Sequence, residues 1–121
     1  MKRNRWITAL LLASLIPVAQ SAFAADTVVP ASAIAKGSTV FHNTCIACHG
    51  ADGKGVLPGM PDFTQPHGVL SLPETVLENR ITNGFSSGNA PMPMPPKGGN
   101  SSLTPSDVKD VIAYLRTTFE Q

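Results

Sequence analysis

The chain has 121 residues, a formal net charge of +1, 11 prolines, 10 glycines and two cysteines. This length predicts a single small domain, and the balanced charge excludes the strongly basic surface of a nucleic-acid-binding protein. The many prolines and glycines predict long stretches of backbone outside regular helices and strands.

Residues 1–24 are typical of a secretory signal peptide. Three basic residues lie within the first five positions, residues 7–18 are mostly apolar, and an Ala-Phe-Ala cleavage pattern ends at Ala24. The apolar run is shorter than the roughly 20 residues of a membrane span. We therefore expect cleavage, export to the periplasm, and a mature domain over residues 25–121. That domain has six basic and eight acidic residues, a net charge of −2.

Residues 33–47 form the first predicted helix, because apolar residues such as Ile34 and Phe41 recur near a helical period. Gly37 lies inside this helix, where glycine is unfavourable, so it requires a packing reason. Residues 50–68 are rich in glycine, proline and aspartate and show no period. A loop of this length in a small domain is usually functional or wraps around something.

A second helix is predicted after Ser71-Leu72-Pro73-Glu74, which has the pattern of a capping box with proline near the helix start. Val76, Leu77 and Ile81 form its apolar stripe, and Asn83-Gly84 marks its end. A further irregular stretch covers residues 85–102. No segment has the alternation of a strand.

The last helix is predicted to begin at Thr104 as the N-cap, with Pro105 at the first helical position and Asp107 at the third. Its apolar residues recur on one face, which we expect to be buried. These residues are Val108, Val111, Ile112, Leu115 and Phe119. The sequence therefore predicts an all-α domain of three main helices joined by two long loops.

Both cysteines lie in the stretch CIACHG, as Cys45 and Cys48, and His49 follows directly. A redox-active dithiol would follow a strand, and none is predicted here. A structural zinc ion needs four ligands, and this short spacing is not that of a zinc finger. A disulfide closing so small a loop would stabilise the fold poorly.

The pattern C-x-x-C-H is instead the attachment signature of c-type haem. Two thiols form thioethers with the haem, and the adjacent histidine ligates its iron. Export agrees with this chemistry, and a small domain with few aromatic residues benefits from a buried cofactor. We therefore predict one haem c, attached through Cys45 and Cys48 and ligated by His49.

A methionine opposite His49 would complete the coordination of the iron and raise its reduction potential, which suits electron transfer. Three candidates follow the motif: Met60, and Met92 and Met94 in PMPMPP, where prolines stiffen the backbone. His67 is a rival ligand.

Nearly all of residues 33–119 resemble the class I cytochrome c family. GSTVFHNTCIACHG is similar to its first helix, and VIAYLR is similar to its last helix, in which Tyr114 would cross beside Gly37. MPD is similar to the loop whose proline, here Pro61, accepts a hydrogen bond from the ligand histidine. LENRITNG and PMPMPPKGG resemble small bacterial electron carriers. By this resemblance Met94 is the axial ligand and Arg80 lies near a haem propionate.

The resemblance implies the class I cytochrome c fold, wrapped around one haem, and a monomeric periplasmic one-electron carrier that is not itself an enzyme. Its partners would be periplasmic reductases, oxidases or dehydrogenases. Two alternatives are a dedicated haem subunit of a larger oxidoreductase and a haem sensor with a labile sixth ligand.

Overall fold

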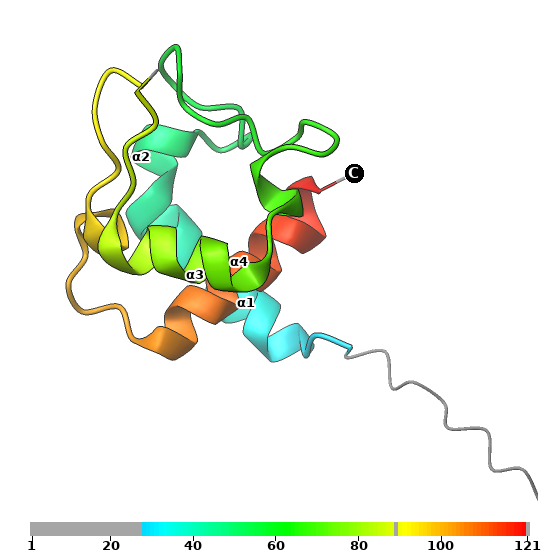
Figure 1. The fold of residues 1–121 in the computed structure, drawn as a ribbon. Helices are drawn as coiled ribbons and strands as arrows, with labels where there is room; N and C mark the ends of the chain where they lie inside the picture. The colour runs from blue at the N-terminus through cyan, green and yellow to red at the C-terminus, as the bar shows by residue number, and fades with distance from the viewer. Residues whose placement is uncertain (1–27, 89, 121) are drawn as a thin grey trace, which may run out of the picture.

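The computed structural model describes residues 28–88 and 90–120. The predicted signal peptide lies outside these residues. Figure 1 shows the helical segments and long loops arranged around the centre of the molecule. The helices are α1 (Ala31–Val40), α2 (Ile46–His49), α3 (Glu74–Asn83) and α4 (Pro105–Phe119), and the other helical turns are Phe41–Cys45, Val69–Ser71 and Pro96–Gly99.

The described residues contain no strand, and their only β-type pairing is one antiparallel bridge between Phe85 and Met94. The prediction of an all-α fold with three main helices is therefore confirmed. No helix among these residues is long and apolar enough to cross a membrane.

The first predicted helix is longer than expected and is interrupted by a π-helical turn. The helical run extends from Ala31 to His49, and its Phe41–Cys45 section has the wider turn. There the Ile46 N–H donates to the Phe41 carbonyl, five residues back. Such turns are rare in proteins as a whole, but those that occur are often found at functional sites. The interruption comes directly before the residues of the C-x-x-C-H motif.

The first and last helices cross at Gly37, in the lower part of Figure 1. A Cβ atom on Gly37 would overlap the backbone carbonyl of Asp110 and would lie 2.8 Å from the Cβ of Tyr114. The close approach explains the glycine inside α1, and the predicted contact between Gly37 and Tyr114 is confirmed.

Replacing Gly37 with alanine should therefore force α1 and α4 apart. We expect Gly37→Ala to lower the free energy of unfolding by about 1–3 kcal/mol, the usual cost of overpacking. Chemical denaturation of the haem-loaded protein measures this change in the free energy of unfolding. Lys36→Ala, on the exposed side of the same helix, is the control. If both variants unfold at the same denaturant concentration, the crossing tolerates a side chain and the explanation is wrong.

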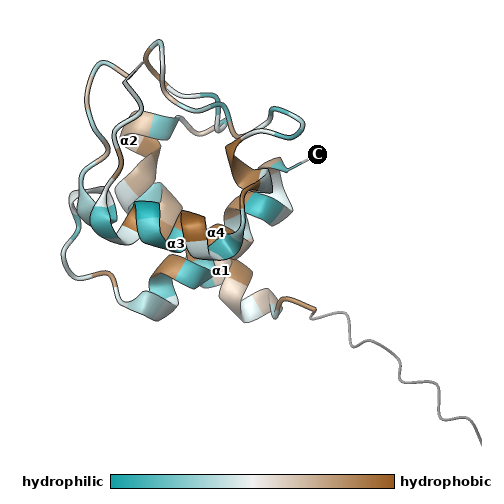
Figure 2. Ribbon diagram, viewed as in Figure 1, coloured by the Kyte–Doolittle hydropathy of each residue, from teal (hydrophilic) through white to brown (hydrophobic). Residues whose placement is uncertain are grey.

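The core is formed by the apolar face of α4, as predicted. Five residues of this helix are buried: Val108, Val111, Ile112, Leu115 and Phe119. They pack with Phe41 from the first helical run, Leu77 from α3, and Phe63 and Leu70 from the loop between them. Figure 2 shows apolar ribbon segments of these elements bordering the centre of the molecule.

The predicted capping box of the second helix is wrong. Pro73 occupies the N-cap position of α3 and provides no side-chain hydrogen bond. The Ser71 hydroxyl instead donates to the Gly68 carbonyl at 2.7 Å, because Val69–Ser71 forms its own short 3₁₀ turn. The predicted end is confirmed, since α3 stops at Asn83 and Gly84 adopts a left-handed φ of 82°.

Thr104 is the N-cap of α4, as predicted, and together with Asp107 it also forms a capping box. The Asp107 N–H donates to Thr104 Oγ1 at 3.2 Å, and the Thr104 N–H donates to Asp107 Oδ2 at 2.8 Å. Hydrogen bonds from the Thr104 side chain and backbone hold the pKa of Asp107 below its usual value, so this carboxylate is charged at neutral pH.

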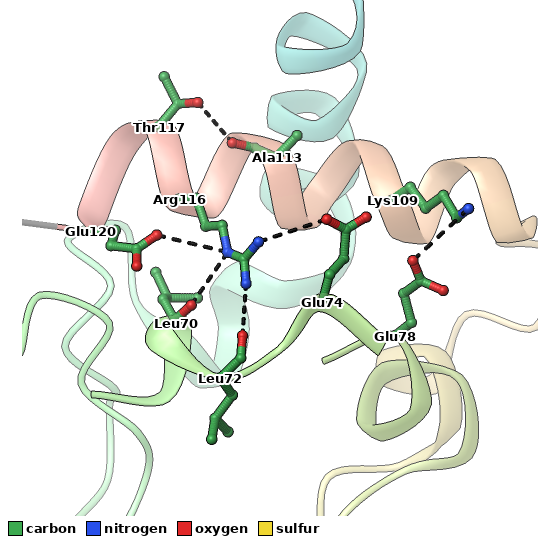
Figure 3. A network of polar contacts seen from close by, with 9 residues as sticks. All are labelled: Leu70, Leu72, Glu74, Glu78, Lys109, Ala113, Arg116, Thr117 and Glu120. Atoms are coloured by element: carbon green, nitrogen blue, oxygen red, sulfur yellow. Dashed lines mark hydrogen bonds and ion pairs between the residues drawn. The ribbon is translucent and has the colours of Figure 1, made fainter. Parts of the chain in front are cut away.

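Arg116 fastens α4 to the segment before α3 (Figure 3). Its guanidinium donates to the carbonyls of Leu70, at 3.2 Å, and Leu72, at 2.7 Å. It also pairs with Glu74, at 3.6 Å, and with Glu120, at 3.7 Å. Leu70 also lines a cavity at the centre of the fold. Arg116 therefore helps to position one part of the cavity wall, although it does not itself line the cavity.

Candidate functional site

A cavity of about 440 Å³ opens at the centre of the fold, and residues from the helices and the long loops line it. Most lining side chains are apolar. Among the described residues of the wall, the charged ones are Arg80 and Lys97, both cationic, and none is a carboxylate. The cavity thus suits a large apolar group that carries some negative charge.

The C-x-x-C-H motif borders this cavity. Cys45 is half-buried and lines it, whereas Cys48 is exposed, and both are free thiols. Burial, with a smaller contribution from Cys48, raises the pKa of the Cys45 thiol to about 11. In the haem-free chain Cys45 is therefore protonated at neutral pH.

His49 lies at the end of α2 and faces the cavity with only 9% of its surface exposed. Its ring stacks on Phe63, with the ring centres 4.8 Å apart and the planes inclined by 21°. Burial lowers the pKa of His49, which favours the neutral imidazole that ligates metals. Phe63 was not predicted, although it is the only aromatic residue in the loop 50–68.

The Nδ1 atom of His49 is buried and has no hydrogen-bond partner among the described residues. Pro61 lines the same cavity, but its carbonyl forms no hydrogen bond with His49 in this structure. A buried polar atom without a partner is costly, so the ring lacks in this structure a hydrogen bond that it needs.

All three candidate methionines line the cavity: Met60, Met92 and Met94. Met94 is half-buried and held by the bridge, in which its N–H donates to the Phe85 carbonyl at 2.8 Å and its carbonyl accepts from the Phe85 N–H at 3.0 Å. Met92 is 49% exposed. The two share a side, as residues two apart on an extended chain do.

His67 is exposed and does not belong to the cavity wall. Among the residues that the structure describes, no three His, Cys, Asp or Glu side chains are grouped to hold a metal ion between them.

Two cations stand at the cavity. The Arg80 guanidinium lies 3.9 Å from the centre of the Phe85 ring. Lys97 was not predicted to line the cavity. It has a left-handed φ of 55° in the turn after Pro96, and no pattern in the sequence marks a non-glycine residue for that conformation.

The site combines a C-x-x-C-H helix, a buried imidazole and a methionine-bearing loop around one apolar cavity, which defines a haem-attachment domain. The sequence pattern of the family Cytochrome c matches residues 34–119. The chain belongs to the cytochrome c family and has the all-α fold of its class I members. Its cofactor is the covalent haem c of that family, for which Cys45, Cys48 and His49 provide the attachment motif.

Curated relatives include both small cytochromes and part of a larger protein. The chain is 35% identical to cytochrome c-554(548) of Halomonas halodenitrificans over 59% of its own length and 80% of that protein. It is 32% identical to cytochrome c-555 of Prosthecochloris aestuarii over 68% of its length and 84% of that protein.

The chain is also 34% identical to the cbb3-type cytochrome c oxidase subunit CcoP of Rubrivivax gelatinosus, over 95% of its own length. It spans only 34% of that subunit. The similarity to CcoP therefore concerns one part of the subunit.

Proposed function

We propose that the mature chain is a monomeric periplasmic one-electron carrier, not itself an enzyme, whose haem c is ligated by His49 and Met94. When bound, haem c supplies an iron that alternates between the ferrous and ferric states. The observation that carries the proposal is an apolar cavity bordered both by the buried His49 ring and by Met94 in its paired segment.

The residues that border the cavity suit haem c. Cys45 and Cys48 provide the two thioethers, and the neutral imidazole of His49 is the nitrogen ligand. In the haem-loaded chain, the unpartnered Nδ1 of His49 would donate to the Pro61 carbonyl, which orients the ring and makes it a better ligand. The cations of Arg80 and Lys97 match the two negative propionates of haem.

Met94 favours electron transfer over catalysis. A thioether is a soft ligand that stabilises the ferrous iron and raises the potential. If His49 and Met94 both ligate the iron, as proposed, haem c would have no position left for a substrate. The remaining role of the chain is to exclude water from the cavity and to present the cofactor to redox partners.

A redox titration of the mature haem-loaded protein tests this proposal. We expect one reversible one-electron transition, a Met–iron absorbance band in the ferric form, and no binding of carbon monoxide to the ferrous form at neutral pH. Carbon monoxide binding under these conditions would mean an open or labile sixth position and would contradict the carrier function.

A second candidate function is a haem-bearing part of a larger oxidoreductase. The observation that favours it is the alignment of 95% of the chain with a segment of CcoP. Purification of the native protein separates the two: a carrier elutes as a free monomer, whereas a subunit elutes with stoichiometric partner chains.

A further inference from the structure

One side-chain hydrogen bond joins the turn that follows Met94 to the helical run that carries the cysteines. Asn100 Nδ2 donates to Thr44 Oγ1 at 3.2 Å, across 56 positions of sequence. Among the hydrogen bonds of the described residues, no other links residues 94–103 with residues 31–49. Thr44 directly precedes Cys45, so the bond ends beside the first thioether position.

Every polar group of Asn100 is engaged. Its Oδ1 accepts from the Ser102 N–H at 3.1 Å, its own N–H donates to the Lys97 carbonyl at 3.1 Å, and its carbonyl accepts from the Leu103 N–H at 3.2 Å. Asn100 is thus fixed with respect to the turn on its N-terminal side and to the approach to α4 on its C-terminal side.

The methyl group of Thr44 supports the same turn by contact. A Cβ atom on Gly98 would lie 3.1 Å from Thr44 Cγ2, so the side chain packs closely on this glycine. Gly98 and Lys97 both have left-handed φ angles, of 63° and 55°. The turn is therefore strained at Lys97 and needs an external restraint to persist.

The segment from Met94 to Leu103, here called the Met94 segment, packs against the end of α3, where a Cβ atom on Gly84 would lie 2.7 Å from the Met94 carbonyl oxygen, but it has few other polar restraints. The Phe85 bridge holds it at Met94, and no ion pair of the described residues involves positions 94–100. Between Met94 and Leu103, the bond from Asn100 to Thr44 is consequently its principal polar anchor to the first helical run.

We propose that Thr44 and Asn100 form a clamp that holds the Met94 segment against the cavity and sets how readily this side of the cavity opens to a small ligand. Both are positioning residues. The consequence for the iron rests on the proposed ligation by Met94, whereas the clamp itself does not.

Amide hydrogen exchange of the haem-loaded protein tests the clamp directly. The reporters are the N–H groups of Gly98 and Asn100, which are bonded to the carbonyls of Pro95 and Lys97. Thr44→Val keeps the shape of the side chain and removes the acceptor. We expect both amides to exchange about fivefold faster, the factor that corresponds to one net hydrogen bond.

Two control variants are used. One keeps the hydroxyl of residue 44, and the other makes the same threonine-to-valine change at a different position. Thr44→Ser keeps the hydroxyl and should restore exchange to within about twofold of wild type, well below the factor for a lost hydrogen bond. Thr39→Val makes the same change on the exposed side of α1, where the threonine bonds only to Ala35 of its own helix. The Ile112 amide in α4 reports on global opening.

The clamp is overturned if Thr44→Val exchanges like Thr39→Val, if Thr44→Ser is as fast as Thr44→Val, or if the Ile112 amide accelerates equally. Imidazole binding to the ferric protein then tests the consequence, since imidazole must displace the sixth ligand. We expect about fivefold tighter binding to Thr44→Val than to wild type. Equal binding would contradict the gating role.

The Met–iron band distinguishes these failures from failure of the proposed function. If Met94→Ala keeps the band, the ligand assignment is wrong, and the amide exchange still decides whether the clamp exists.

Discussion

Met94→Ala is expected to remove the ferric Met–iron absorbance band, to lower the reduction potential markedly and to let the ferrous protein bind carbon monoxide. A thioether is a soft ligand that stabilises ferrous iron, so removing the proposed ligand should disfavour the ferrous state and leave its position open. Met94 is the best-fixed methionine at the cavity, because its N–H and carbonyl both pair with Phe85. Absorbance spectra and a redox titration measure these changes.

Met92→Ala and Met60→Ala are the matched controls, since both residues also line the cavity. Met92 is 49% exposed and is outside the bridge, so we expect its replacement to leave the band and the potential unchanged. If Met92→Ala loses the band and Met94→Ala keeps it, the assignment is reversed. If only the double variant loses it, the segment can shift by two residues and either sulfur ligates.

Preventing haem attachment should have the largest effect on stability. The cavity has a volume of about 440 Å³. Its lining is mostly apolar, so leaving it unfilled would deprive the side chains of the core of packing partners, a large cost for a small domain of marginal stability. The haem-free chain should therefore lack a stable, cooperatively folded state with this cavity.

The double variant Cys45→Ala/Cys48→Ala tests this expectation. It should lose covalent haem, and circular dichroism should show reduced helicity and no cooperative thermal transition. Thr39→Ala, on the exposed side of α1, controls for substitution in the same helical run. A haem-free chain that melts cooperatively near the temperature of the haem-loaded protein would contradict the argument.

The features that sequence predicted well depend on residues close together in the chain. The Thr104 N-cap and the apolar spacing in α4 are local signals, and both agree with the structure. The C-x-x-C-H motif is equally local. The interior position of Gly37 indicated a close contact, although the partner, Asp110, lies far away in sequence.

The features that the sequence did not predict depend on competing hydrogen bonds or on contacts between residues far apart in the chain. Ser71 has the pattern of an N-cap residue, but its hydroxyl donates to the Gly68 carbonyl in a 3₁₀ turn and does not cap α3. Phe63 reaches the His49 ring only because the long loop folds back over the cavity. The bond from Asn100 to Thr44 spans 56 positions, and neither residue has a local signal for it. Such contacts follow from packing, which no short pattern encodes.

The crossing of α1 and α4 has a consequence for the order of maturation. The first helical run meets its partner only when the last helix has been made, because α4 ends at Phe119. Bringing together segments so far apart carries an entropy cost of chain closure, which slows this step of folding. In the folded chain Cys45 is half-buried and packs against the core to which α4 contributes, so attachment of the cofactor should be easier before α4 docks.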